Sequence, residues 1–304
     1  MIDHMPTSGT QSADGGHSRF ITAPDGLRLH IRIWGKDRSG LPLVCLPGLT
    51  RTVDDFAPLA TAVAGKHDGI GPVYGLDSRG RGRSDHDRNP DNYTVQTELA
   101  DLIAALTALD IGKAVFLGSS RGGLLVMMLA VARPTVIAGA VLNDIGPMIG
   151  AAGLMRIKGY VGHLPRPRNH EEGAEILKRV FGGQFPALTA QDWRLWSGRA
   201  WRERDGHLTP THDPRLAATL KAVRPDSQLP SLWREFDALA AAGPVLTIRG
   251  ELSDILSSDT LAQMKARQPG TRYLIIKNEG HTPLLSDNTS ISEIAAFVGA
   301  CNAG

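Results

Sequence analysis

The sequence predicts an α/β fold with a mostly parallel central sheet, helices on both faces of the sheet, and one helical insertion. Short apolar runs typical of buried strands alternate with helical segments along most of the chain, and this alternation favours a parallel sheet covered on both faces. The alternation stops between residues 147 and 243, where helical pieces, prolines and four of the five tryptophans occur without a convincing buried strand. The 304 residues are enough for one large domain with such an insertion.

The chain before the insertion predicts a hairpin followed by alternating strands and helices. Residues 20–34 alternate apolar and polar side chains around Pro24, Asp25 and Gly26, which favours a hairpin. Asp54 can cap a helix that runs to about residue 64. The other expected elements are buried strands at residues 42–46, 73–76, 114–117 and 138–143, and helices at residues 93–109 and 124–132.

The alternation resumes after the insertion. Strands are expected at residues 244–248 and 273–276, and helices near residues 258–267 and 291–300. The predicted division is therefore a core of residues 20–146 and 244–304, with the insertion at 147–243. Residues 1–19 are polar and contain no apolar stretch, so we expect a disordered tail there and no signal peptide.

The composition argues against several classes of partner. The net charge is +2, and the single basic run at residues 79–83 directly follows a strand, so we expect no nucleic-acid partner. That run also lacks the context of a phosphate or dinucleotide loop, and we predict no cofactor. The longest apolar run, residues 124–132, is about half of the roughly 18 residues that a membrane span needs.

The histidines and cysteines add two further expectations. Four histidines of the insertion show no clustered, helix-spaced arrangement, so no metal site is predicted. Cys45 lies inside an apolar strand, and Cys45 and Cys301 cannot build a disulfide framework, which fits a reducing compartment. We therefore expect a cytoplasmic protein without a membrane span.

The most informative segment runs from Gly118 to Gly123 and has the pattern G-x-S-x-G around Ser120. An apolar strand precedes it and an apolar helix follows it. Such a turn is so tight that side chains at the glycine positions would clash, and it holds the serine hydroxyl beside a helix N-terminus that favours negative charge. Ser120 is therefore a candidate nucleophile.

Two later segments carry polar residues directly after strands. Asp254 follows the strand at 244–248 through a short turn, and His281 stands in the segment Gly-His-Thr-Pro after the strand at 273–276. A serine hydroxyl needs a general base within about 3 Å, and the base needs an orienting acceptor. The order Ser, Asp, His along the chain can supply all three groups.

These motifs resemble the α/β-hydrolase superfamily, and specifically its capped, serine carboxylesterase-like members, from about residue 20 to residue 298. The resemblance implies that the insertion is a helical cap over the active site. It also implies that Ser120 is the nucleophile, His281 the base and Asp254 the acid that holds the histidine. Some members carry the acid after the preceding strand, where this chain has Asp144. Asp144 is therefore the alternative acid, and Asp254 is favoured because its strand and turn match the commoner arrangement.

The oxyanion of such an enzyme needs backbone N–H donors. The resemblance points to the amides of Arg121, directly after the nucleophile, and of Leu49. The chain departs from the family at the second position, because Pro47 stands where a histidine usually braces the loop. The Arg121 side chain is expected to form an ion pair within the fold, or alternatively to face the pocket mouth and attract an anionic substrate.

The function expected from these residues is hydrolysis of a carboxylic ester, with small-molecule esters, lactones or polyester chains as substrates. One alternative keeps the same three residues and cleaves a carbon–carbon bond of a dicarbonyl compound. The other is a ligand receptor on the same fold. Enzymes that open epoxides or remove halides use an aspartate where this chain has Ser120, which disfavours those activities.

Overall fold

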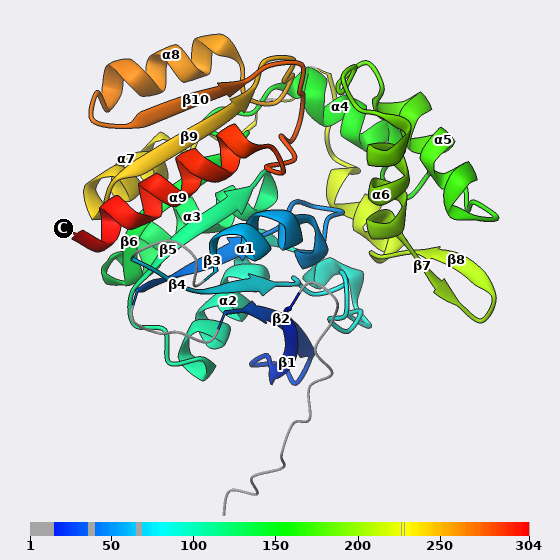
Figure 1. The fold of residues 1–304 in the computed structure, drawn as a ribbon, viewed down its shortest axis with the longest axis horizontal. Helices are drawn as coiled ribbons and strands as arrows, with labels where there is room; N and C mark the ends of the chain where they lie inside the picture. Colours follow the sequence, from blue (N-terminus) through cyan, green and yellow to red (C-terminus); the bar gives the residue numbers. More distant parts are fainter. Residues whose placement is uncertain (1–14, 36–39, 65–68, 226, 228, 304) are drawn as a thin grey trace, which may run out of the picture.

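The protein is described by a computed structural model that covers residues 15–35, 40–64, 69–225, 227 and 229–303. The described residues contain an eight-stranded sheet with the order β1-β2-β4-β3-β5-β6-β9-β10 (Figure 1). β2 pairs antiparallel with β1 and β4, and the other neighbours are parallel. The strands are β1 His17–Thr22, β2 Arg28–Trp34, β3 Leu41–Leu46, β4 Ile70–Leu76, β5 Ala114–Ser119, β6 Ile137–Asn143, β9 Val245–Gly250 and β10 Arg272–Ile276. The predicted fold class is confirmed.

Helices cover both faces of the sheet, because the central strands are apolar on both sides. In β5, Ala114 and Phe116 join one buried cluster, while Val115 and Leu117 join the other. The second cluster is covered by α1 and α9, and the first by four other helices (Figure 1). These helices are α1 Ala57–Val63, α2 Val95–Ala108, α3 Arg121–Ala132, α7 Trp233–Ala242, α8 Ser258–Arg267 and α9 Asn288–Ala303.

The insertion forms a separate layer on one side of the sheet. Its elements are α4 Ala151–Tyr160, α5 His170–Phe181, α6 Ala190–Ala200 and the hairpin of β7 Trp201–Arg204 with β8 His207–Pro210, at the right of Figure 1. Aromatic side chains give this layer a core of its own: the rings of Trp193 and Trp196 stack 5.3 Å apart, and Trp201 is buried beside them. We use the name cap for the elements α4 to β8.

The predicted end of the insertion at residue 243 is too late. Trp233 and the rest of α7 follow the cap in sequence, but Phe236 and Leu239 are fully buried in the cluster that contains α3. Figure 1 shows α7 beside the sheet and away from the cap. The apolar side chains of α7 recur every three residues, and this pattern does not reveal which partner the helix packs against.

The N-terminal boundary also differs from the expectation. Residues 1–14 of the predicted tail lie outside the described residues. His17 to Arg19 belong to β1, because they pair with β2 from Ile31 to Ile33. Further along, the capping residue is Thr52 and not Asp54: the Thr52 hydroxyl accepts the Asp54 N–H at 3.3 Å.

The described helices include none that is long and apolar enough to cross a membrane.

We predict that Phe236→Ala lowers the free energy of unfolding of the whole core. Phe236 is fully buried, and removing a buried phenyl ring typically costs about 3–5 kcal/mol. Urea denaturation of this variant should show one transition at a lower urea concentration than in the wild type. Leu195→Ala, at a 57% exposed position of α6, should change the free energy of unfolding by less than about 0.5 kcal/mol. A Phe236→Ala protein as stable as the wild type would place α7 outside the core.

Candidate active site

Ser120 lies at the turn between β5 and α3 in a conformation that side chains rarely adopt, with φ of 50°. The glycines around it make this turn possible. A Cβ at Gly122 would collide with the carbonyl oxygen of Leu46 in β3, and a Cβ at Gly118 would collide with the backbone of Gly122 and Gly123. The strand and the helix therefore approach closely enough to hold Ser120 at the end of the sheet, at the N-terminus of α3.

The side chains of Ser120, His281 and Asp144 form one hydrogen-bonded series. His281 Nε2 lies 2.8 Å from Ser120 Oγ, and His281 Nδ1 lies 2.7 Å from Asp144 Oδ2. His281 is buried, with 6% of its surface exposed, and Asp144 is fully buried. This is the arrangement of nucleophile, base and orienting acceptor that activates a serine hydroxyl.

Asp144 is held from two further directions. Its Oδ1 accepts the Gly250 N–H at 2.8 Å, and the Ser253 hydroxyl donates to Oδ2 at 2.5 Å. The cap reaches the same region, because Gln184 Oε1 accepts the backbone N–H of His281 at 2.8 Å. A buried carboxylate with this many donors keeps a fixed orientation toward His281.

The favoured placement of Asp254 beside the histidine is wrong, and the alternative, Asp144, occupies that position. Asp254 forms a two-pronged ion pair with Arg156 of α4, with distances of 2.6 and 2.8 Å. Burial opposes the charge of Asp254, but Arg156 outweighs it and lowers the pKa of the carboxyl below its usual value. The reason is strand order: β6, which ends just before Asp144, is the direct neighbour of β5, whereas β9 lies one strand further out.

The two amides expected to hold the oxyanion, of Arg121 and Leu49, both belong to segments that line this site. Arg121 is the first residue of α3, where N–H groups have no partner within the helix. Leu49 lies in the loop after β3. Arg81 donates from Nε to the Leu49 carbonyl at 2.7 Å and is buried against Glu98. This arginine fixes the loop that lacks the usual histidine, which sequence reasoning did not find.

The Arg121 side chain forms the expected ion pair within the fold. Its Nε lies 2.7 Å from Glu98 Oε2, and its Nη2 donates to the Tyr93 carbonyl at 3.0 Å. Arg81 shares the same carboxylate. Of the two expectations for Arg121, the structure therefore supports the internal ion pair.

The basic run at residues 79–83 is a buried ion-pair network that also anchors the cap. Arg79 binds Asp101 and Asp87 at 2.6–2.7 Å and is 1% exposed. Backbone hydrogen bonds join Gly82 and Gly80 of the run to the segment after β8. Arg79 and Arg81 of the run are therefore structural, whereas Arg83 is exposed at the surface.

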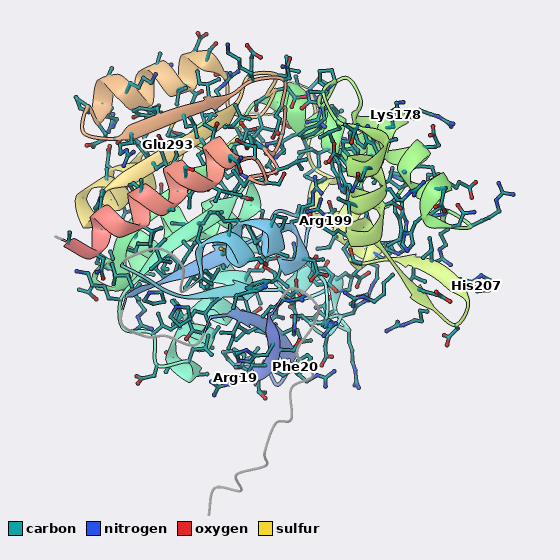
Figure 2. All side chains as sticks on the ribbon, viewed as in Figure 1. Arg19, Phe20, Lys178, Arg199, His207 and Glu293 are labelled. Carbon is teal, nitrogen blue, oxygen red and sulfur yellow. The ribbon has the colours of Figure 1, made fainter. Side chains whose placement is uncertain are left out.

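A cavity of about 220 Å³ lies between this site and the cap. Its walls are mostly apolar, and Ser120 and His281 are among the residues that line it. In Figure 2 Arg199 lies between the cap and the core, whereas Lys178 and His207 lie at the outer edge of the cap. The lining side chains include Leu49, Ile157, Leu177, Phe181, Trp196 and Trp201, and the polar ones include Arg51, Asp55, Tyr160, Arg166, Arg199 and His212.

His212 is neutral at physiological pH. Burial, and then the charge of Arg81, lower its pKa to about 4. His212 can therefore act as a hydrogen-bonding wall of the cavity without adding charge. Within the described ranges, no group of three or more histidine, cysteine, aspartate or glutamate side chains could hold a metal ion.

A second Ser–His–Asp series occurs outside the cavity. His30 Nδ1 lies 2.7 Å from Asp77, and His30 Nε2 lies 2.9 Å from Ser18 Oγ. Ser18 lies within β1, where it pairs with Arg32, and its hydroxyl also accepts a hydrogen bond from Arg83. No tight strand–helix turn and no helix N-terminus accompany it, so hydrogen-bond distances alone do not define the active site.

Comparison with known proteins identifies the family. A family model of the alpha/beta hydrolase fold matches residues 42–287, and the chain therefore belongs to this family. It is 32% identical over 283 residues to the 3-hydroxybutyrate-oligomer hydrolase of Cupriavidus necator, covering 90% of this chain and 94% of the relative.

Two further similarities cover most of the chain. The crystal structure of an alpha/beta hydrolase from Novosphingobium aromaticivorans has a TM-score of 0.86 and 38% identity, covering 93% of this chain and 98% of that chain. The 2-(acetamidomethylene)succinate hydrolase of Mesorhizobium japonicum is 24% identical over 265 residues, covering 86% of this chain and 89% of the relative. The two relatives from Cupriavidus necator and Mesorhizobium japonicum are both named as hydrolases, and their names give different substrates.

Glu279 gives the loop that carries His281 a pH-dependent contact. Its carboxylate accepts the Leu284 N–H at 2.8 Å, while burial, aided by the charge of Asp287, raises its pKa from 4.5 to about 7. Because the pKa is raised in the folded state, the stabilising contribution of Glu279 is present below pH 4.5 and is lost as the pH rises toward 7.

We predict that Glu279→Gln removes this part of the pH dependence. The free energy of unfolding, measured with urea at pH 5 and pH 8, should fall less between the two pH values in the variant than in the wild type. Glu175→Gln, at an exposed position of α5, should follow the wild type. Parallel pH profiles for wild type and Glu279→Gln would contradict the prediction.

Proposed function

We propose that this protein hydrolyses carboxylic esters through an acyl-enzyme on Ser120. The observation that carries the proposal is the hydrogen-bonded series of Ser120, His281 and Asp144, of which Ser120 and His281 line an apolar cavity. The backbone N–H groups of Leu49 and Arg121 are the proposed oxyanion donors: Leu49 lines the same cavity, and Arg121 directly follows Ser120.

In the first step the Ser120 oxygen attacks the ester carbonyl carbon, and His281 Nε2 takes the hydroxyl proton. The carbonyl oxygen becomes an oxyanion beside the proposed donors, where preorganised N–H groups stabilise it. The bond between the carbonyl carbon and the alkoxy oxygen then breaks. His281 returns its proton to that oxygen, and the alcohol leaves while the acyl group stays on Ser120.

In the second step water replaces the alcohol. His281 takes a proton from water as the water oxygen attacks the acyl carbon, and the bond to Ser120 breaks when the proton reaches the serine oxygen. The carboxylic acid is released. Throughout, Asp144 accepts from Nδ1–H, so that Nε2 is free to act as base, and stabilises the imidazolium.

Short esters of hydroxy acids are the proposed substrate class. The cavity of about 220 Å³ is smaller than the roughly 300–1,000 Å³ of pockets for drug-sized ligands. Its walls combine branched aliphatic and aromatic side chains. The name of the Cupriavidus necator relative, 3-hydroxybutyrate-oligomer hydrolase, supports an oligomer of a small hydroxy acid.

We predict that the protein cleaves p-nitrophenyl esters and that Ser120→Ala lowers kcat by at least about 10⁴-fold. The series should run from acetate to decanoate, with release of p-nitrophenol as the readout. The cavity volume favours the short acyl chains. A folded wild-type protein without turnover on any ester would contradict the proposal, and would leave carbon–carbon bond cleavage or ligand binding without turnover.

We predict that Asp144→Asn lowers kcat by about 10³–10⁴-fold, because the histidine would lose the acceptor that fixes its tautomer. Asp254→Asn should change kcat by less than about threefold, because Asp254 pairs with Arg156 and not with His281. Circular dichroism and melting curves establish that both variants are folded. The reverse ranking of the two variants would assign the acid to Asp254.

A further inference from the structure

Two arginine side chains line the cavity with incomplete ionic partners. Arg51 follows Leu49 by two residues in the loop after β3, and Arg199 comes from α6 of the cap. Both approach a single carboxylate oxygen, Asp55 Oδ1, at 3.5 Å and 3.8 Å respectively. These distances are too long for good hydrogen bonds. Within the described part of the chain, neither guanidinium group donates a hydrogen bond, and Arg199 Nε is a buried donor without an acceptor.

The neighbouring carboxylates do not supply the missing partner. Asp54 binds Arg32 at 2.6 Å, and its other oxygen lies 3.7 Å from Arg202. Asp55 Oδ2 faces the Thr52 N–H at the start of the short helix that follows. Three arginines, Arg51, Arg166 and Arg199, line the cavity, and Asp55 is the carboxylate among its lining residues. Arg166 is exposed to solvent, so the two less exposed guanidinium charges, of Arg51 and Arg199, are opposed by one carboxylate.

The burial of these positive charges costs free energy. Burial disfavours the charged form of Arg51 and lowers its pKa; Asp55 opposes this effect and the charge of Arg199 adds to it. The side chains of Arg51 and Arg199 are only 21% and 19% exposed, so water solvates them partially. Burying a charge without a hydrogen-bonded partner costs free energy, and an anion bound between these two side chains would offset that cost.

The orientation of Arg51 leaves its donors available. Its guanidinium lies over the ring of Trp196, 4.2 Å from the ring centre. A contact with a ring face needs no hydrogen bond from the guanidinium, so this contact does not take the place of a carboxylate acceptor. Arg51 also starts close to the nucleophile: a Cβ placed on Gly48 would lie 3.6 Å from both Arg51 Cγ and Ser120 Cβ.

We propose that Arg51 and Arg199 together bind a carboxylate of the substrate, so that this protein selects esters that carry a free carboxylate over neutral esters. This inference rests on the proposed ester hydrolysis. A guanidinium binds a carboxylate through two parallel hydrogen bonds, and a pair of them recognises one anion with high selectivity. In an oligomer of a hydroxy acid the free carboxylate lies on the alcohol side of the last ester bond. Binding it at Arg51 and Arg199 places the terminal hydroxy acid as the leaving group.

The experiment compares two dimers of 3-hydroxybutyrate with one scissile ester each: the free acid and its N-methyl amide. The value of kcat/KM is measured for both dimers in the wild type, Arg51→Gln and Arg199→Gln. We expect the wild type to prefer the acid, and each variant to reduce the ratio of acid to amide by about 10- to 100-fold, the value of one or two charge-assisted hydrogen bonds. Arg194→Gln is the matched control. Arg194 lies on α6 like Arg199, but it is 64% exposed and pairs with Glu171, so this variant should keep the wild-type ratio of acid to amide.

A second measurement separates binding from turnover. Calorimetry with Ser120→Ala should show tighter binding of the acid dimer than of the amide dimer, and Arg51→Gln added to Ser120→Ala should remove the difference. If the wild type cleaves both dimers equally, or if the ratio survives in both arginine variants, the carboxylate site is wrong while ester hydrolysis stands. If neither dimer nor any p-nitrophenyl ester is cleaved, ester hydrolysis is wrong, and the calorimetric comparison still decides whether the arginines bind a carboxylate.

Discussion

The close approach of α3 to the sheet at Ser120 is the constraint on which the rest of the site depends. Because Gly118 and Gly122 have no side chains, the first turn of α3 contacts β3 and β5 directly, and Ser120 takes a positive φ at the junction. This one contact places the hydroxyl at the end of the sheet and brings the Arg121 amide and the loop after β3 to the same point. The helix N-terminus there favours the negative charge of an oxyanion. The sequence could predict this turn, because the glycines that it requires lie within two residues of Ser120.

The acid residue could not be decided in that way, because its identity depends on the order of strands. Asp144 and Asp254 both follow apolar strands through short turns, and local patterns treat them alike. In the sheet, β6 adjoins β5, so a side chain directly after β6 lies beside the serine turn and meets His281. Asp254, one strand further out, meets Arg156 of the cap instead. Asp254, which the sequence motif favoured as the acid, thus connects the core to the cap, and Asp144 contacts the histidine.

The same limit explains which parts of the fold the sequence could predict. Apolar runs located the strands and helices within a few residues, because burial on both faces of a parallel sheet leaves a clear pattern. The predicted end of the cap was too late, because an amphipathic helix such as α7 has the same sequence pattern whether it packs against the sheet or within the cap. The brace from Arg81 to the Leu49 carbonyl joins residues 32 positions apart, and it was hidden for the same reason. Local sequence patterns predict where helices and strands lie, whereas the contacts between distant segments, which local patterns do not contain, decide what each segment does.

The arginines of this protein differ in how closely carboxylates approach them, and this difference distinguishes structural arginines from those proposed to bind a ligand. Arg121 was expected to form an ion pair within the fold, with attraction of an anionic substrate as the alternative. It and Arg81 meet Glu98 at 2.7 Å and also donate to backbone carbonyls. Arg79 is likewise enclosed by carboxylates. These three arginines thus have carboxylate partners within 2.8 Å. Among the residues that the structure describes, the carboxylate nearest to Arg51 and Arg199 is that of Asp55, at 3.5 and 3.8 Å. Since burial of an incompletely paired cation lowers stability, we infer that a substrate completes the ion pair beside the nucleophile. An ester with its own carboxylate meets that requirement and also fits the apolar walls.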